Sequence, residues 1–314
     1  MNTKLLRSIA IALVAPMLLL ATACGSKSDN GSGGSQAAGK VTVVSQQFPE
    51  ADIMTELYSA LLKKAGFDVS TKALATRDLY LPALEKGSVQ ISTDYLSSMT
   101  EALNRQANGD KAAEVATHDA NATVAKLKEL GDKYGITALD PAEAQDANAF
   151  AVTKKFADAH NLKTLSDLAA LGQEITLGAA PDCDGRQDCK LGLEQTYGLK
   201  IKKVVPTGFG TDQTKKDLTD GHTQLGQVGT SDATLDKAGL VILEDDKGLQ
   251  NAENLVPVVN SAWLKSHPKA ADALNPLASV LTTDDLAQMI AAVSVGREKA
   301  ADVAQAYLKD KGLI

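Results

Sequence analysis

The sequence predicts an α/β protein built from two lobes. From residue 41 onward, short apolar segments alternate with amphipathic segments, which is the pattern of strands connected by helices. The alternation occurs in the first part of this stretch and again in the middle, and the C-terminal part then becomes helical. About 275 residues are too many for one simple core, so two lobes are expected.

The first run of elements predicts a parallel sheet flanked by helices. We expect strands at 41–45, 67–74 and 89–92, and helices at 51–65, 78–86, 98–107 and 110–134. Ile53, Leu57 and Leu61 share one face of the first of these helices. Glycines end the first two helices. Strands that alternate with helices in this way usually pair in parallel.

The second run repeats the theme. We expect strands at 149–153, 174–178, 202–206, 224–228 and 240–243, and helices at 165–171, 191–197, 269–281, 283–295 and 298–311. Thr164, with Asp167 at the third helical position, has the pattern of an N-cap, and so does Thr282 or Thr283 before Asp284 and Asp285. No internal repeat of solenoid length is visible.

The N-terminal residues predict export. Lys4 and Arg7 precede an apolar run from Ile9 to Leu20, which is shorter than the roughly 20 residues that span a bilayer. Residues 1–23 are therefore interpreted as a signal peptide. Cys24 follows small residues directly, which resembles a bacterial lipoprotein signal and predicts that Cys24 is lipidated. An ordinary signal peptide with a chance cysteine is the alternative.

Residues 24–40 predict a flexible, lipid-anchored linker. Glycine, serine, alanine and polar residues dominate this segment, and they cannot build a core. Removing Lys4 and Arg7 from the 32 basic residues leaves 30 against 39 acidic ones, a net charge of −9. Such an acidic chain is a poor partner for nucleic acid. We expect a protein held at the outer face of the cytoplasmic membrane.

The two remaining cysteines, Cys183 and Cys189, predict a disulfide. They lie six apart in a polar, glycine-containing segment, and an exported pair at this spacing favours a disulfide. A metal site is disfavoured because two thiols need further ligands. A calcium loop starting at Asp182 is disfavoured because Leu193 stands where a bidentate glutamate is needed.

No catalytic motif is visible. The four histidines are scattered, and neither a phosphate-binding glycine-rich loop nor a metal cluster stands out. Gly208-Phe209-Gly210 alone is too weak a pattern to indicate nucleotide binding. We therefore expect no enzyme, no cofactor and no metal.

Several segments, taken in order, carry a resemblance to a known family. They are 41–50, 81–87 followed by Asp94-Tyr95, 148–152, 165–168, 192–193 with 197–199, 230–232, 243–246 and 257–259. Together they are similar to the substrate-binding lipoproteins of ABC importers for osmoprotectants such as glycine betaine, choline and carnitine. The resemblance covers nearly all of residues 41–314.

The resemblance implies a two-lobe periplasmic-binding-protein clamp of type II, with a ligand cleft between the lobes. Lobe 1 would comprise residues 41–145 plus 255–314, and lobe 2 residues 146–254. The chain would cross between the lobes near Asp146 and near Asn254, and these two crossing segments would be the hinge. Ligand binding would favour a closed form that docks on the permease subunits of the importer. The partners implied are thus a small solute, the permease and the membrane. A monomer is expected.

The resemblance also implies ligand-binding residues. A quaternary ammonium group is held by aromatic faces. The family motif Tyr-Thr-Gly-Thr matches Tyr95-Leu96-Ser97-Ser98, and the arginine of the disulfide loop matches Arg186. Other aromatic positions of the family fall on Asn148, Gly229 and Glu253, and its lysine falls on Gln46. Phe48, Tyr80 and Phe209 are further candidate rings, and Thr230 is a candidate hydroxyl.

Each candidate has a structural alternative. Tyr95 could pack between helices, and Asn148 could serve only the backbone of the hinge. Arg186 could pair with Asp184 or Asp188. Thr230 and Ser231 could cap a helix from Asp232, and Glu253 could be a solvated loop charge. Trp263 is interpreted as an anchor for the C-terminal helices.

Three functional alternatives stay open at this point. Because most of the family's ring positions are not aromatic here, the receptor could bind another small polar or cationic solute. A more remote alternative is a surface lipoprotein that binds a partner protein. An extracytoplasmic enzyme on the same scaffold would need an acid–base set that the sequence does not display.

Overall fold

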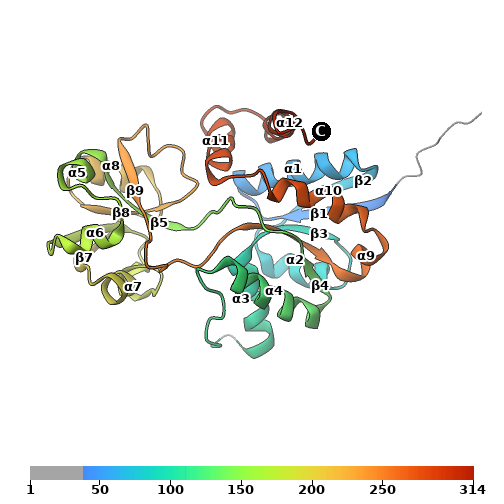
Figure 1. Ribbon diagram of the computed structural model, residues 1–314, viewed down its shortest axis with the longest axis horizontal. Helices are drawn as coiled ribbons and strands as arrows, with labels where there is room; N and C mark the ends of the chain where they lie inside the picture. Colours follow the sequence, from blue (N-terminus) through green and yellow to red (C-terminus); the bar gives the residue numbers. More distant parts are fainter. Residues whose placement is uncertain (1–37, 110) are drawn as a thin grey trace, which may run out of the picture. The chain divides into compact units, whose positions relative to one another are not determined.

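The computed structural model describes residues 38–109 and 111–314, and these residues form two mixed β-sheets with helices on their faces (Figure 1). The predicted signal peptide and the predicted lipidation site Cys24 lie outside the described residues, as does most of the expected linker. No helix within the described ranges is long and apolar enough to cross a membrane.

The first sheet has the strand order β2-β1-β3-β10-β4. The strands β1, β2 and β3 are parallel, whereas β10 pairs antiparallel with both β3 and β4. The strands span Gly39–Ser45 (β1), Phe67–Ala73 (β2), Ile91–Tyr95 (β3), Ile136–Ala138 (β4) and Leu255–Asn260 (β10). We call this sheet and its helices the first lobe.

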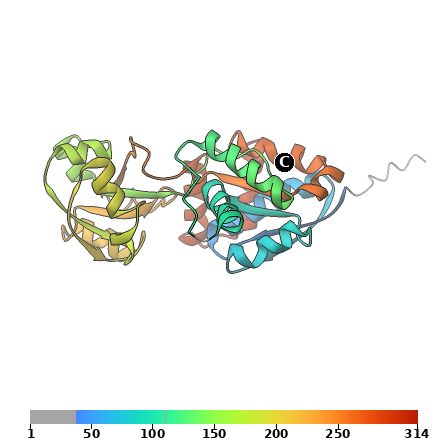
Figure 2. The ribbon, with the colours of Figure 1, turned by 90° about the horizontal axis from the view of Figure 1, so that it is seen from below.

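Helices cover both faces of the first sheet (Figures 1 and 2). On one face α1 packs against α10, α11 and α12, and on the other α3 packs against α4. The helices are Pro49–Lys64 (α1), Arg77–Glu85 (α2), Leu96–Asn108 (α3), Ala120–Tyr134 (α4), Ser261–Ser266 (α9), Lys269–Ala278 (α10), Thr283–Ser294 (α11) and Ala300–Asp310 (α12).

The second sheet has the order β7-β6-β8-β5-β9, and we call it and its helices the second lobe. Here β6 is parallel to β7 and β8, and β5 is antiparallel to β8 and β9. The strands are Asn148–Thr153 (β5), Glu174–Ala179 (β6), Lys200–Pro206 (β7), Leu225–Gly229 (β8) and Leu240–Leu243 (β9).

The helices of the second lobe are short. They are Lys154–His160 (α5), Leu165–Ala170 (α6), Lys190–Gly192 (α7) and Asp212–Thr219 (α8), with a 3₁₀ turn at Cys183–Gly185 (η1) and a π-helical turn at Leu193–Tyr197 (η2). The chain passes from the first sheet to the second after β4 and returns after β9. The expected crossing points near Asp146 and Asn254 fall in these two connections, while the exact lobe boundaries stay a prediction.

Alternating side chains of β10 show how one strand serves two cores. Leu255 and Val259 belong to the core under α1 and the C-terminal helices, whereas Val256 and Val258 belong to the core under α3 and α4. The second lobe likewise has a separate core on each face of its sheet. Each lobe therefore buries apolar side chains on both sides of its sheet.

Several sequence-based expectations need correction. The helix expected at 110–134 begins only at Ala120, because Glu101 accepts hydrogen bonds from the N–H groups of Val115 and Ala116 and Asp119 caps the helix. The linker expected to reach residue 40 ends earlier, since β1 begins at Gly39. The helix expected at 191–197 is α7 followed by the π-helical turn η2. Of the described elements, β4, β10, α5, α8, α9 and the 3₁₀ turn η1 were not foreseen.

Two further corrections concern candidate site residues. Thr230 and Ser231 cap no helix, because residues 230–239 form successive turns. Tyr80 is no cleft ring: its side chain is fully buried in the core beneath α2, and its hydroxyl donates to Asp94. The N-caps Thr164 and Thr282 are confirmed, each with a capping box. Trp263 packs on the first core and stacks on His267, as expected of an anchor.

Candidate functional site

The ends of β1 and β3 bring two aromatic rings together. These strands are parallel and adjacent, so their carboxyl ends lie at one edge of the sheet, where ligands of α/β proteins usually bind. Phe48 precedes Pro49, which starts α1, and Tyr95 is the last residue of β3. The Phe48 and Tyr95 rings stack with centroids 6.4 Å apart.

Glu50 is buried next to these rings. It is only 4% exposed, and the Tyr95 hydroxyl donates to its Oε1 over 2.6 Å. Burial, and then the nearby Asp146 carboxylate, raises the pKa of Glu50 well above its usual value. Burial and the Glu50 carboxylate likewise raise the pKa of Tyr95. The charged groups that act most strongly on both residues are therefore acidic.

Asp146 links this edge to the second lobe. It lies on the connection between β4 and β5, where its N–H donates to the Glu253 carbonyl over 3.1 Å. Its Oδ1 accepts from the Ser231 hydroxyl over 2.5 Å. We call Phe48, Glu50, Tyr95, Asp146 and Ser231 the acidic cluster.

Gly229 and Phe209 lie beside Asp146. A Cβ at Gly229 would lie 3.3 Å from Asp146 Oδ1 and 3.4 Å from Phe209 Cζ, closer than most real Cβ contacts. Glycine therefore lets the end of β8 approach both side chains. A cavity of about 280 Å³ is lined by Asp146, Phe209, Gly229, Ser231 and apolar residues of α11. Phe209 is 47% exposed.

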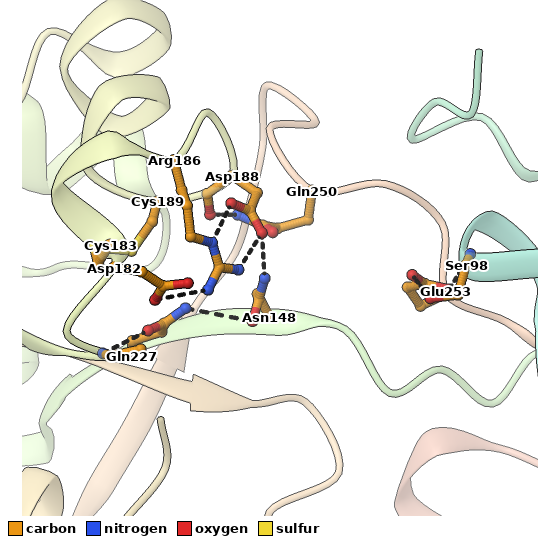
Figure 3. Close-up of polar contacts among 11 residues, drawn as sticks. Ser98, Asn148, Asp182, Cys183, Arg186, Asp188, Cys189, Gln227, Gln250 and Glu253 are labelled. Atoms are coloured by element: carbon orange, nitrogen blue, oxygen red, sulfur yellow. Dashed lines mark hydrogen bonds and ion pairs between the residues drawn. A yellow bond between two sulfur atoms is a disulfide. The ribbon is translucent and has the colours of Figure 1, made fainter. Parts of the chain in front are cut away.

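Ser98 and Glu253 form a second contact. The Ser98 hydroxyl and its N–H both donate to the Glu253 carboxylate, over 2.7 and 3.1 Å (Figure 3). Burial raises the pKa of Glu253. The expected alternative of a freely solvated loop charge at Glu253 is therefore wrong.

Figure 3 shows a third group around Asp188, on the disulfide loop of the second lobe. Arg186 Nε donates to Asp188 Oδ1 over 2.8 Å, and Asn148 Nδ2 donates to Asp188 Oδ2 over 2.8 Å. Gln227 donates to Asn148 over 3.4 Å, and Gln250 to the Asp188 carbonyl over 2.9 Å. We call Asn148, Asp182, Arg186, Asp188, Gln227 and Gln250 the Asp188 cluster.

The disulfide and the ion pairs fix this cluster. The predicted Cys183–Cys189 disulfide is present, and both cysteines are buried. The hydrogen bond that Arg186 donates to Asp188 raises the pKa of Arg186, and the charge of Asp188 adds to this effect, so that together they outweigh the cost of burial. Asp182 is a second partner of Arg186, whereas Asp184 pairs with Lys190. The ion-pair alternative for Arg186 thus holds for Asp188.

The structure places the remaining candidates differently. The Thr230 hydroxyl accepts from the Ala147 N–H and donates to the Gln145 carbonyl, so it ties the turn after β8 to the crossing segment. Asn148 bonds to side chains, not to the backbone of the hinge. Gln46 follows β1 and is half-buried, and its side chain makes no hydrogen bond to the described residues.

Sequence reasoning missed Glu50 and Asp146 as site residues. Glu50 follows Pro49 at a helix start, where an acid is common for reasons of helix polarity alone. Asp146 was noted only as a crossing point. Within residues 38–109 and 111–314, no three His, Cys, Asp or Glu side chains form a group able to hold a metal ion.

Comparison with known proteins gives concordant results. Residues 39–310 match the family model described as the substrate-binding domain of an ABC-type glycine betaine transport system. The glycine-betaine-binding protein of Pseudomonas aeruginosa is 25% identical over 276 residues, covering 85% of this chain and 86% of the relative.

A second relative, YehZ, has a solved structure. The glycine betaine-binding protein YehZ of Escherichia coli is 27% identical over 288 residues, which cover 88% of this chain and 92% of YehZ. The structure of apo YehZ superimposes with a TM-score of 0.75 over 88% of this chain and 99% of that one, at 25% identity. With its two α/β lobes of type II clamp topology, this chain belongs to the family of substrate-binding domains of ABC-type glycine betaine transport systems.

Proposed function

We propose that this protein is the extracytoplasmic solute receptor of an ABC importer. It binds a quaternary ammonium osmoprotectant of the glycine betaine or choline type and delivers it to the permease. The observation that carries the proposal is the family match over residues 39–310. The ligand contacts both lobes when they close, so binding shifts the population toward the closed form that the permease recognises.

The rings of the acidic cluster supply the recognition of the ammonium group. A quaternary ammonium has no N–H to donate, and it is attracted to aromatic faces by about 0.5–2 kcal/mol for each well-placed ring. The stacked pair of Phe48 and Tyr95 and the half-exposed ring of Phe209 are the three rings in reach of this role. Glu50 and Asp146 add the opposite charge.

A glycine and several polar residues complete the proposed site. Gly229 leaves room beside Phe209, and Thr230 positions the crossing segment. The remaining polar candidates for contact with the far end of the ligand are Gln46, Ser98, Asn148, Arg186 and Glu253. Of these, Ser98, Asn148, Arg186 and Glu253 bond to other side chains in the structure.

The cellular context completes the proposal. Export through residues 1–23 and lipidation at Cys24 hold a monomer at the outer face of the cytoplasmic membrane. Residues 41–145 and 255–314 form one lobe, and residues 146–254 form the other. The protein works by binding and release and catalyses no reaction.

A second candidate is the same receptor role for a different small polar or cationic solute. Asn148, Gly229 and Glu253 favour it, because they stand where the family carries further rings. Asn148 and Glu253 both bear hydrogen-bonding groups that suit a ligand with N–H or O–H donors.

Isothermal titration tests the proposal. The purified protein is unfolded and refolded to remove carried-over ligand, then titrated with glycine betaine, choline, carnitine, proline betaine, ectoine, polyamines and polyols. We expect a trimethylammonium compound to bind, and Tyr95→Ala to weaken it roughly tenfold or more, the loss of one good cation–π contact. Tyr95→Phe keeps the ring and serves as the control. Binding of only a polyamine or polyol favours the second candidate.

A further inference from the structure

Two carboxylates of the acidic cluster have no cationic partner among the described residues. Glu50 is 96% removed from solvent, and its bonded neighbour is the neutral hydroxyl of Tyr95. Asp146 is half-buried and bonded to the neutral hydroxyl of Ser231. An ionised carboxylate out of water is costly unless an opposite charge compensates it. The cluster therefore has excess negative charge that a ligand can neutralise.

Three basic side chains close to the candidate residues already form ion pairs with carboxylates of the protein. Arg77 is clamped by the fully buried Asp94, with Nε and Nη2 donating over 2.6 to 3.2 Å. Arg186 pairs with Asp188 and Asp182. Lys215 Nζ lies 2.6 Å from Asp232, at the cavity beside Phe209. Each of these cations would have to break an internal ion pair to bind a ligand carboxylate.

Among the described residues, Arg105 and Lys247 line cavities that contain candidate residues and form no ion pair. Lys247 shares its cavity, which Asn148 and Thr230 also line, with Glu244, Asp245 and Asp246, and its Nζ donates to the Thr196 carbonyl over 3.1 Å. Arg105 is exposed on α3, and its cavity is also lined by Arg77 and Arg186 and by the carboxylates of Glu101, Glu114, Asp188 and Glu253. In each of these two cavities the carboxylates outnumber the lysine and arginine side chains, so neither offers a net positive end for a zwitterion. The described residues therefore give the candidate site an excess of negative charge both around Phe48 and Tyr95 and around Ser98 and Glu253.

We propose that the ligand of this site is a net cation that carries no carboxylate, of the choline type and not the glycine betaine type. The inference rests on the proposed function, since it concerns the same site and the same ammonium recognition by Phe48 and Tyr95. An ammonium group gains both the ring faces and the charges of Glu50 and Asp146. The carboxylate of a zwitterion adds a third negative charge, and the basic side chains near the candidate residues are either in ion pairs or outnumbered by carboxylates.

Titration with matched ligands tests the proposal. Glycine betaine and its methyl ester differ mainly in the carboxylate charge, and choline differs from its carbon analogue, in which a tert-butyl group replaces trimethylammonium, in the cationic charge. We expect the ester and choline to bind at least tenfold more tightly than glycine betaine. The carbon analogue should bind at least tenfold more weakly than choline.

Matched variants assign the effect to the cluster. Glu50→Gln should weaken choline about tenfold and leave glycine betaine unchanged or improved. Asp52→Asn removes the same charge two residues later on α1, from an exposed position, and should change neither affinity. The preference itself is a readout that a folding defect does not mimic.

The outcomes separate the two proposals. Glycine betaine binding as tightly as its ester, or more tightly, overturns the net-cation inference and leaves the receptor function standing. An unchanged preference in Glu50→Gln also overturns the assignment to this cluster. If no trimethylammonium compound binds, the proposed quaternary ammonium function is rejected, and the net-cation inference fails with it.

Discussion

In the Asp188 cluster the carboxylates meet arginine and amide donors, whereas in the acidic cluster Glu50 and Asp146 meet only hydroxyls and each other's charge. The Asp188 cluster is partly exposed and stapled by a disulfide, while Glu50 is buried at a helix start. A charge that is compensated within the fold, such as that of Asp188, stabilises the folded structure. Charge that is left unsatisfied within the fold is available to a ligand.

The largest effect is expected at Asp94, a buried carboxylate outside both clusters whose charge is fully compensated within the fold by Arg77. Asp94→Asn leaves Arg77 largely buried without its partner, and breaking such a pair costs about 3–5 kcal/mol. We expect a marked drop in the free energy of unfolding, measured by urea denaturation. Asp236→Asn, at an exposed pair with Lys154, is the control and should cost about 1 kcal/mol at most. Similar losses in the two variants would contradict the distinction.

The next largest effect concerns the staple of the Asp188 cluster. Replacing both Cys183 and Cys189 by alanine should cost about 2 kcal/mol, the value of the chain-entropy model for so short a loop. Urea denaturation of the variant under oxidising conditions measures it. Reducing agent should lower the stability of the parent protein and leave the variant unchanged. Equal sensitivity of both proteins to the reductant would show that the disulfide is not the cause.

The smallest effect probes the unsatisfied charge itself. The folded pKa of Glu50 lies above its unfolded value, so its stabilising contribution is complete below about pH 4 and is lost as pH rises through the folded pKa. Glu50→Gln cannot ionise and can still accept from Tyr95. We expect the variant and parent to melt together near pH 4.

At pH 8 the variant should be more stable by more than about 0.5 kcal/mol, beyond the range of ordinary surface substitutions. Thermal unfolding across pH, without ligand, measures the difference. Asp78→Asn is the control here, because Asp78 is likewise an acid in the first turn of a helix and its side chain is exposed. A pH-independent difference between Glu50→Gln and the parent would mean that Glu50 is compensated in the fold.

Local patterns in the sequence predicted much of the architecture. Alternation of apolar and amphipathic segments located most strands and helices, and the capping residues Thr164 and Thr282 marked their helices correctly. The parallel pairing of β1, β2 and β3 followed from the same alternation. The disulfide followed from spacing and export alone.

What escaped prediction depends on residues that are distant in the chain. The short strand β4 has a place only because β10, more than a hundred residues later, pairs with it. Residues 111–119 leave the helical pattern because Glu101 binds their N–H groups. Glu50 and Asp146 become partners only through the fold, since each alone is an ordinary acid in the sequence. A local sequence pattern does not show which charged residues the fold brings together.

The placement of β10 has a consequence for the order in which the molecule assembles. This strand lies between β3 and β4 in the first sheet, and α12 packs on α1, so residues 255–314 complete the first lobe. The strands of the second lobe, by contrast, all come from one contiguous stretch of chain. For a chain that emerges N-terminus first, the second lobe can fold while the first must wait for the C-terminal segment. The emerging chain therefore carries a half-built first lobe, whose sheet stays incomplete until β10 is available.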